Sequence, residues 1–90
     1  MVRRKSTGTK TPKLPADIRR QAVQKELGKR IVAWRLDKHL SQEAFADICG
    51  IHRSHMGQVE RGETNVTLGT LVTITVWLEQ SLSQLFDGIE

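Results

Sequence analysis

The sequence predicts an all-α fold, and three helix-start signals carry that prediction. Ser41 and Thr67 each stand before a segment with helical character, where a hydroxyl side chain can accept a hydrogen bond from a free amide of the first turn. Ser81 and Gln84 form a capping box, in which each side chain bonds the backbone amide of the other residue. We therefore expect one helix to begin after each of these three cap residues.

The length and composition describe a small soluble domain. The 90 residues make at most one domain, and 38% hydrophobic with 27% charged residues is ordinary for a soluble protein. No apolar run approaches the roughly 20 residues of a membrane span, and the basic N-terminus lacks the apolar segment of a secretory signal. The single cysteine, Cys49, excludes an internal disulfide and fits a reducing compartment. We expect a cytoplasmic protein with no membrane contact.

The net charge of +4 is unevenly distributed along the chain. Residues 1–38 contain 12 Lys and Arg against 3 Asp and Glu, whereas residues 39–90 contain 2 against 7. A basic half indicates a polyanionic partner, most simply nucleic acid, so we expect the protein to be nucleoid-associated. We expect the acidic side chains of the second half to lie on faces away from that partner.

The first part of the chain divides into a basic arm and a helical extension. Residues 1–13 carry five basic residues, no acidic residue and no periodicity, so we expect them to be disordered. They form either a solvated tail or an arm that follows DNA phosphates through Arg3, Arg4 and Lys5. Residues 14–26 are predicted to form a helical extension of the main domain, which covers residues 27–90.

Helical spacing begins just after Pro15, which suits the first turn of a helix. Apolar residues recur at this spacing from Ile18 to Leu27. The extension either continues into the next helix, over residues 27–38, or breaks near Gly28. The residues expected to face inward in that next helix are Leu27, Ile31, Trp34 and Leu36.

Residues 41–62, SQEAFADICGIHRSHMGQVERG, predict two short helices joined by a tight turn. Gly50 stands where the chain reverses, and glycine takes the left-handed conformation there without steric cost. The second helix, residues 53–61, has an outer face with hydrogen-bonding groups and no large apolar residue, which suits the major groove of DNA. The expected inner residues are Ala44, Phe45, Ala46, Ile48 and Cys49 in the first helix and Met56, Val59 and Glu60 in the second.

Two further helices are predicted after residue 67. Residues 68–78 are rich in β-branched residues and resemble a strand in isolation, but the spacing of their inward set favours a helix. That inward set is Leu68, Leu71, Val72, Thr75 and Leu78. A short helix then continues through Phe86 and is ended by Gly88.

The order of these features resembles the helix-turn-helix family of the lambda-type phage repressors, Cro and the Xre regulators. The similar segments are LGKRIVAWR at 27–35, LSQEAFA at 40–46, CGIHRSHMGQVERGE at 49–63 and TLGTLVTITVWLEQSLSQLF at 67–86, about two thirds of the chain. A single short segment is a weak sign of membership in this family, but all four segments in this order and at these spacings are a strong one. The resemblance implies a five-helix lambda-repressor-like domain that binds duplex DNA. His39 stands where the family usually has glycine, so we expect a cost in stability or a different helix end there.

The resemblance also implies which residues read DNA bases. The start of the second motif helix, and one position further along it, reach base edges in the family, which assigns this role to His52, Arg53, Ser54 and Gln58. Arg53 can donate two hydrogen bonds to a guanine, and its alternative role is a phosphate contact. Gly57 is expected on the same exposed face, where it either allows close approach to DNA or is a neutral solvent position.

Phosphate contacts are implied on both sides of the reading helix. Gln42 begins the first motif helix, whose positive end favours a phosphate. The residues after the reading helix that can bind the DNA backbone are Arg61, Thr64 and Asn65. Thr64 and Asn65 are alternatively polar loop residues without a DNA contact. Arg35 and Glu60 match a partly buried ion pair that is structural and sets the tilt of the reading helix.

The C-terminal segment carries more apolar side chains than a short helix pair needs for a monomer core. Relatives such as restriction–modification controllers and phage repressors dimerise through their last helices, so the resemblance implies a homodimer. The predicted interface residues are Ile74, Trp77, Phe86 and Ile89, with DNA half-sites one helical turn, ~34 Å, apart. The alternative for Trp77 is a place in the core.

We interpret the chain as a sequence-specific transcriptional regulator that acts as a repressor on a palindromic operator. An alternative from another class is an antitoxin that binds a toxin partner and its own operator. A weaker alternative is non-specific chromosome binding, which removal of residues 1–13 would impair more than loss of Arg53.

No cofactor, metal or catalytic activity is expected. The sequence contains no nucleophile elbow, no glycine-rich phosphate loop and no paired-carboxylate spacing. Cys49, His52 and His55 have a spacing that zinc can use, with His39 as a fourth ligand. The predicted helices, however, turn Cys49 inward and the two following histidines outward, so these side chains do not converge.

Overall fold

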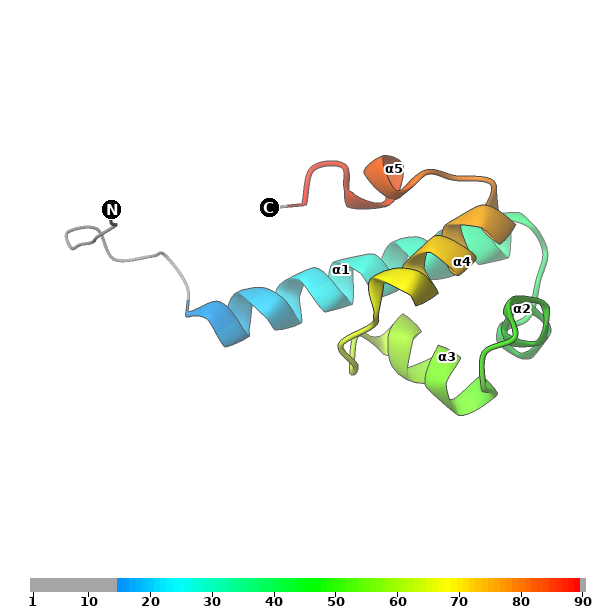
Figure 1. The fold of residues 1–90 in the computed structure, drawn as a ribbon, viewed down its shortest axis with the longest axis horizontal. Helices are drawn as coiled ribbons and strands as arrows, with labels where there is room; N and C mark the ends of the chain where they lie inside the picture. The colour runs from blue at the N-terminus through cyan, green and yellow to red at the C-terminus, as the bar shows by residue number, and fades with distance from the viewer. Residues whose placement is uncertain (1–14, 90) are drawn as a thin grey trace.

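The computed structural model of the chain describes residues 15–89, and within this range it contains five helices and no strand (Figure 1). The helices are α1 (Ala16–Asp37), α2 (Gln42–Cys49), α3 (Arg53–Arg61), α4 (Leu68–Leu78) and α5 (Leu82–Phe86). The expected all-α fold is confirmed. None of these helices is long and apolar enough to cross a membrane. The predicted basic arm, with Arg3, Arg4 and Lys5, lies outside the described residues.

α1 is one continuous helix of 22 residues, so the extension enters the domain without a break at Gly28. Its first turns project beyond the other helices, and its second half lies between α3 and α5 (Figure 1). Gly28 has a packing role instead, because a Cβ atom there would lie 2.8 Å from the carbonyl oxygen of Val59. The glycine therefore allows the end of α3 to pack directly against α1.

All five helices share one hydrophobic core. Each of the five helices contributes at least one large, fully buried side chain, and these are Ile31, Phe45, Met56, Ile74, Leu78 and Leu85. Full burial of such a side chain contributes roughly 1.5–3 kcal/mol. This shared core holds the pair α2 and α3 against α1, α4 and α5.

The predicted helix starts are confirmed. Ser41 Oγ accepts a hydrogen bond from the amide of the third residue of α2 at 3.0 Å, and Thr67 Oγ1 does the same for α4 at 3.1 Å. Ser81 and Gln84 form both hydrogen bonds of the capping box. His39 has a φ of 60°, so histidine adopts the left-handed conformation that glycine holds at lower cost.

Several residues that were expected to face inward are exposed. Leu36 at the end of α1 and Ile48 on α2 lie on the surface. In α4, the expected inward residues Leu71, Thr75 and Leu78 are buried, but Leu68 and Val72 are 66% and 43% exposed, and Ile74 is fully buried instead. The 11 residues of α4 include no charged side chain, so the sequence has no charged face to define its rotation. The expectation that Ile74 lies in a dimer interface is wrong, because this residue belongs to the core of one chain.

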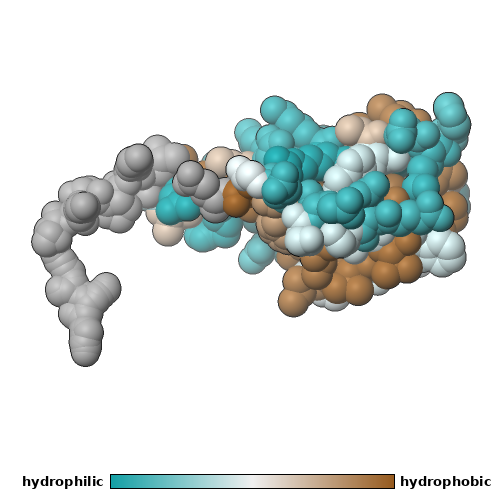
Figure 2. All heavy atoms as spheres, turned by 90° about the horizontal axis from the view of Figure 1, so that it is seen from above, coloured by the Kyte–Doolittle hydropathy of each residue, from teal (hydrophilic) through white to brown (hydrophobic). Residues whose placement is uncertain are grey.

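The α4 outer face, formed by Leu68, Val72, Val76 and Trp77, is apolar. Val76 and Trp77 are 64% and 52% exposed, so Trp77 does not fill the core. Figure 2 shows an apolar area along one side of the folded body. Such a face on a small protein typically marks an interaction surface.

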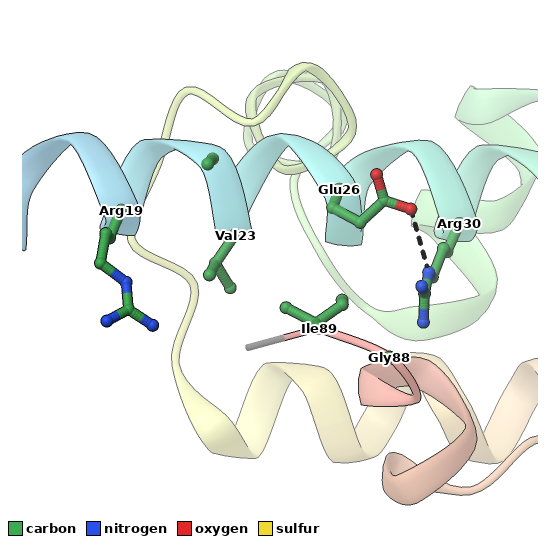
Figure 3. Close-up of a pocket in the computed structure, with 7 residues that line it drawn as sticks. Arg19, Val23, Glu26, Arg30, Gly88 and Ile89 are labelled. Atoms are coloured by element: carbon green, nitrogen blue, oxygen red, sulfur yellow. Dashed lines mark hydrogen bonds and ion pairs between the residues drawn. The ribbon is translucent and has the colours of Figure 1, made fainter. Parts of the chain in front are cut away.

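The C-terminal segment is tied back onto α1. Arg30 Nη1 donates hydrogen bonds to the carbonyl oxygens of Leu85, at 2.9 Å, and Asp87, at 2.6 Å. Figure 3 shows Ile89 turned toward α1 near this arginine. Phe86 and Ile89 are partly buried against the core of their own chain. Both predicted interface residues are therefore only partly available to a second copy.

Candidate nucleic-acid interface

α2 and α3 form the predicted helix-turn-helix. Gly50 ends α2 with a φ of 69°, and the Ile51 amide donates to the Ala46 carbonyl at 2.9 Å. Met56 and Val59 bury the inner side of α3 in the core. The turn therefore holds α3 across the end of α2 and leaves the opposite side of α3 open.

The four residues predicted to read bases lie on that open side. His52, Arg53, Ser54 and Gln58 are all exposed. The His52 side chain makes no capping hydrogen bond, so the first amides of α3 have no side-chain acceptor at this cap. These amides and the polar side chains together offer donors to a ligand in front of the helix.

Arg53 has a partner that sequence reasoning missed, Asp47 in the last turn of α2. Arg53 Nη2 donates to Asp47 Oδ2 at 2.9 Å, and Arg53 Nε donates to Oδ1 at 3.3 Å. The hydrogen bond from Arg53 lowers the pKa of the Asp47 carboxyl, so this group is ionised at neutral pH. The pair spans the turn between two helices, so the spacing rule for pairs within one helix did not reveal it.

A buried ion pair joins α1 to the end of α3, as the family resemblance implies. Arg35 Nε donates to Glu60 Oε2 at 2.7 Å and Nη2 donates to Oε1 at 3.0 Å, and the two side chains are 9% and 3% exposed. Arg35 also donates to the Leu40 carbonyl at 2.7 Å. The Gln42 side-chain amide donates to Glu60 Oε1 at 2.8 Å, so this predicted phosphate ligand belongs to the same network. One network of hydrogen bonds thus sets the positions of α1, α2 and α3.

Gly57 is buried, and the expectation of an exposed position is wrong. A Cβ atom there would lie 3.0 Å from Nη1 of Arg61 and 3.3 Å from Oε1 of Gln42. The glycine therefore makes room for two of the predicted phosphate-contacting side chains. Arg61 also forms an ion pair with Glu63, in which Nε lies 3.0 Å from Oε1. The other two residues, Thr64 and Asn65, follow in the loop before α4, where Asn65 is exposed.

The cysteine and histidines of the motif do not form a metal site. Residues 15–89 contain no group of three or more His, Cys, Asp and Glu side chains that could hold a metal ion. Burial raises the pKa of the Cys49 thiol to about 11, so the thiol is protonated and poorly reactive at neutral pH.

Similarities to known proteins identify the family. The sequence model of the helix-turn-helix family matches residues 31–76. Control protein C.SmaI of Serratia marcescens is 40% identical over 70 residues, which are 78% of this chain and 83% of the relative. Control protein C.MunI of a Mycoplasma species is 38% identical over 64 residues, 70% of this chain and 86% of the relative. The crystal structure of the restriction-modification controller protein C.AhdI from Aeromonas hydrophila has a TM-score of 0.69 and 37% identity, and the match covers 72% of this chain and 98% of that one.

These similarities define a DNA-binding transcriptional regulator. The chain belongs to the helix-turn-helix family, as its sequence motifs indicate, and it is similar to restriction–modification controller proteins. The family and these relatives indicate a regulator of transcription.

Proposed function

We propose that this protein is a homodimeric repressor that binds a palindromic operator and controls the genes of a restriction–modification system. The observation that carries the proposal is the exposed row of hydrogen-bonding side chains on α3, which contains no large apolar residue. The relatives that are named control proteins support the choice of restriction–modification genes.

Base recognition belongs to the open side of α3 in this proposal. Arg53 donates two hydrogen bonds to O6 and N7 of a guanine, a contact worth about 1–3 kcal/mol of discrimination. Gln58 pairs with an adenine further along the groove, and Ser54 donates or accepts as a weaker reader. His52, at the start of the helix, adds a contact to a base edge or the adjacent backbone.

Phosphate contacts hold α3 in register on both sides. The amides at the start of α2 and the Gln42 side chain bind one phosphate group, helped by the positive end of the helix. Arg61, Thr64 and Asn65 bind the backbone on the other side of the groove. The arm residues Arg3, Arg4 and Lys5 extend this contact along the DNA.

A second copy of the chain covers the α4 outer face. A two-fold dimer buries the same face on both protomers, which removes the exposed Leu68, Val72, Val76 and Trp77 side chains from water. This assignment replaces Ile74 in the predicted interface and keeps Trp77. Phe86 and Ile89 contribute at its edge through their exposed parts.

Selection from a randomised duplex pool at two salt concentrations tests the DNA-binding proposal. A palindromic consensus with guanine in each half-site, bound at least tenfold (about 1.4 kcal/mol) more weakly by Arg53→Ala, supports it. Lys29→Ala is the matched control, because it removes one exposed positive charge from α1. Enrichment of no sequence with a steep salt dependence indicates a non-specific binder, and no binding at all indicates a protein partner.

The dimer is tested by sedimentation of a Val76→Asp variant. A charge on the α4 outer face is expected to shift the protein from dimer to monomer and to weaken operator binding. Ile48→Asp is the control, because it places the same charge at an exposed aliphatic position on α2. An unchanged dimer in Val76→Asp argues against this interface. Repression is tested by placing the selected operator over the promoter of a reporter gene.

A further inference from the structure

We infer that Asp47 is a positioning residue for base recognition, which holds the Arg53 guanidinium so that one edge stays free to read a guanine. This inference rests on the proposed function, because it concerns how the reading surface distinguishes bases. It gives a role to a residue of α2, outside the helix that enters the groove.

The geometry of the pair leaves the reading edge of the arginine open. Asp47 accepts from Nε at 3.3 Å and from Nη2 at 2.9 Å, which uses one side of the guanidinium. A guanidinium carries five N–H groups in a rigid plane, so two on Nη1 and one on Nη2 remain. Nη1 and Nη2 form the end of the fork, which matches O6 and N7 of guanine. Arg53 can therefore bind Asp47 and a guanine at the same time.

The pairing orders Arg53 before DNA arrives. The Arg53 side chain is 63% exposed, so packing alone restricts it little. A long side chain loses conformational entropy when it becomes fixed on a base, and a side chain that is already fixed loses less. Asp47 therefore reduces the entropy cost of the guanine contact.

The negative charge of Asp47 weakens binding to DNA that lacks the contacted guanine. The pair has no net charge, so Arg53 gains little from a phosphate, while the nearby carboxylate is repelled by the DNA backbone. This repulsion is offset where a guanine satisfies the free edge of Arg53. The pairing thus favours base reading over a phosphate contact for Arg53, and it lowers affinity for non-specific DNA.

The test compares three duplexes: the selected operator, the operator with the contacted guanine replaced, and a scrambled duplex. The variants are Asp47→Asn, Asp47→Ala, Arg53→Ala and the double variant Asp47→Ala/Arg53→Ala. Glu43→Gln is the matched control, because it removes one negative charge from the same helix and leaves the hydrogen bonds between Asp47 and Arg53 in place. Thermal unfolding of each variant separates recognition from folding.

Guanine discrimination is expected to fall roughly three- to tenfold in Asp47→Ala. The loss is smaller in Asp47→Asn, which keeps one acceptor, and smallest in Glu43→Gln, while affinity for the scrambled duplex rises in all three. In the Arg53→Ala background, Asp47→Ala causes no further loss of guanine discrimination. Unfolding temperatures stay close to that of the wild type.

Two results would overturn the inference. The first is that Asp47→Ala changes guanine discrimination no more than Glu43→Gln does. The second is that Asp47→Ala has the same effect on guanine discrimination in the Arg53→Ala background as in the wild type. In either case the wild type still selects an operator, and the proposed function stands. If the wild type selects no sequence, the proposed function fails and this inference fails with it.

Discussion

The buried ion pair between Arg35 and Glu60 allows a direct test of how α3 is held. Replacing Arg35 with methionine leaves the Glu60 carboxylate, 3% exposed, with the Gln42 amide as its remaining side-chain donor among the described residues. The change also removes the donor to the Leu40 carbonyl. Stranding one partner of a buried ion pair costs about 3–5 kcal/mol. Small domains have about 5–15 kcal/mol of unfolding free energy, so a large part of the stability should be lost.

A double-mutant cycle separates the buried charge from lost packing. Arg35→Met/Glu60→Met contains no stranded charge, so we expect it to be more stable than either single variant, with a coupling energy of about 2 kcal/mol or more. Urea unfolding followed by circular dichroism provides the four free energies. Lys38→Met is the control, because its partner Glu79 is 80% exposed and such a surface pair contributes less than about 1 kcal/mol.

Two results would refute this reasoning. The first is an Arg35→Met variant whose unfolding free energy lies within about 1 kcal/mol of the wild type, because a loss this small is typical of an exposed ion pair. The second is a double variant whose loss equals the sum of the two single losses, which would mean that the two groups do not interact.

Three further predictions concern single positions. His39→Gly should raise the free energy of unfolding by about 1 kcal/mol, because φ is 60° there; a lower melting temperature would contradict this. Gly57→Ala should weaken operator binding, because its Cβ would lie 3.0 Å from Arg61 and 3.3 Å from Gln42 and would displace both side chains; unchanged affinity would show that these positions of Arg61 and Gln42 are not used. With a pKa of about 11, native Cys49 should react with a thiol reagent at pH 8 on the order of 100-fold more slowly than in urea, and equal rates would argue against its burial. Because the pKa of the thiol is higher in the folded protein, the folded state favours the neutral thiol. Its contribution to the free energy of unfolding is complete below about pH 8.5 and is lost as the pH rises toward 11. Urea unfolding across this pH range measures the change.

Local sequence patterns correctly predict where helices α2, α4 and α5 begin and how the motif turns. Ser41 and Thr67 act on amides three residues away, so their effect depends on local geometry that a sequence displays directly. Gly50 likewise marks the turn because its left-handed conformation is a local property. The family resemblance added one contact at long range, between Arg35 and Glu60, because the whole motif order implies it.

Several other features depend on how one helix packs against another, and local sequence patterns do not show them. In α4 the helical spacing placed Leu71, Thr75 and Leu78 on the buried side, but it did not show where that side ends. No charged residue marks its edges, so the exposure of Leu68 and the burial of Ile74 were not predicted. The burial of Gly57 depends on side chains that reach it from elsewhere, and the pairing of Asp47 with Arg53 depends on the angle between α2 and α3. Local hydrogen bonds decide where a helix starts. The face that it buries and the partners of its exposed side chains are decided by the free energy of packing against its neighbours.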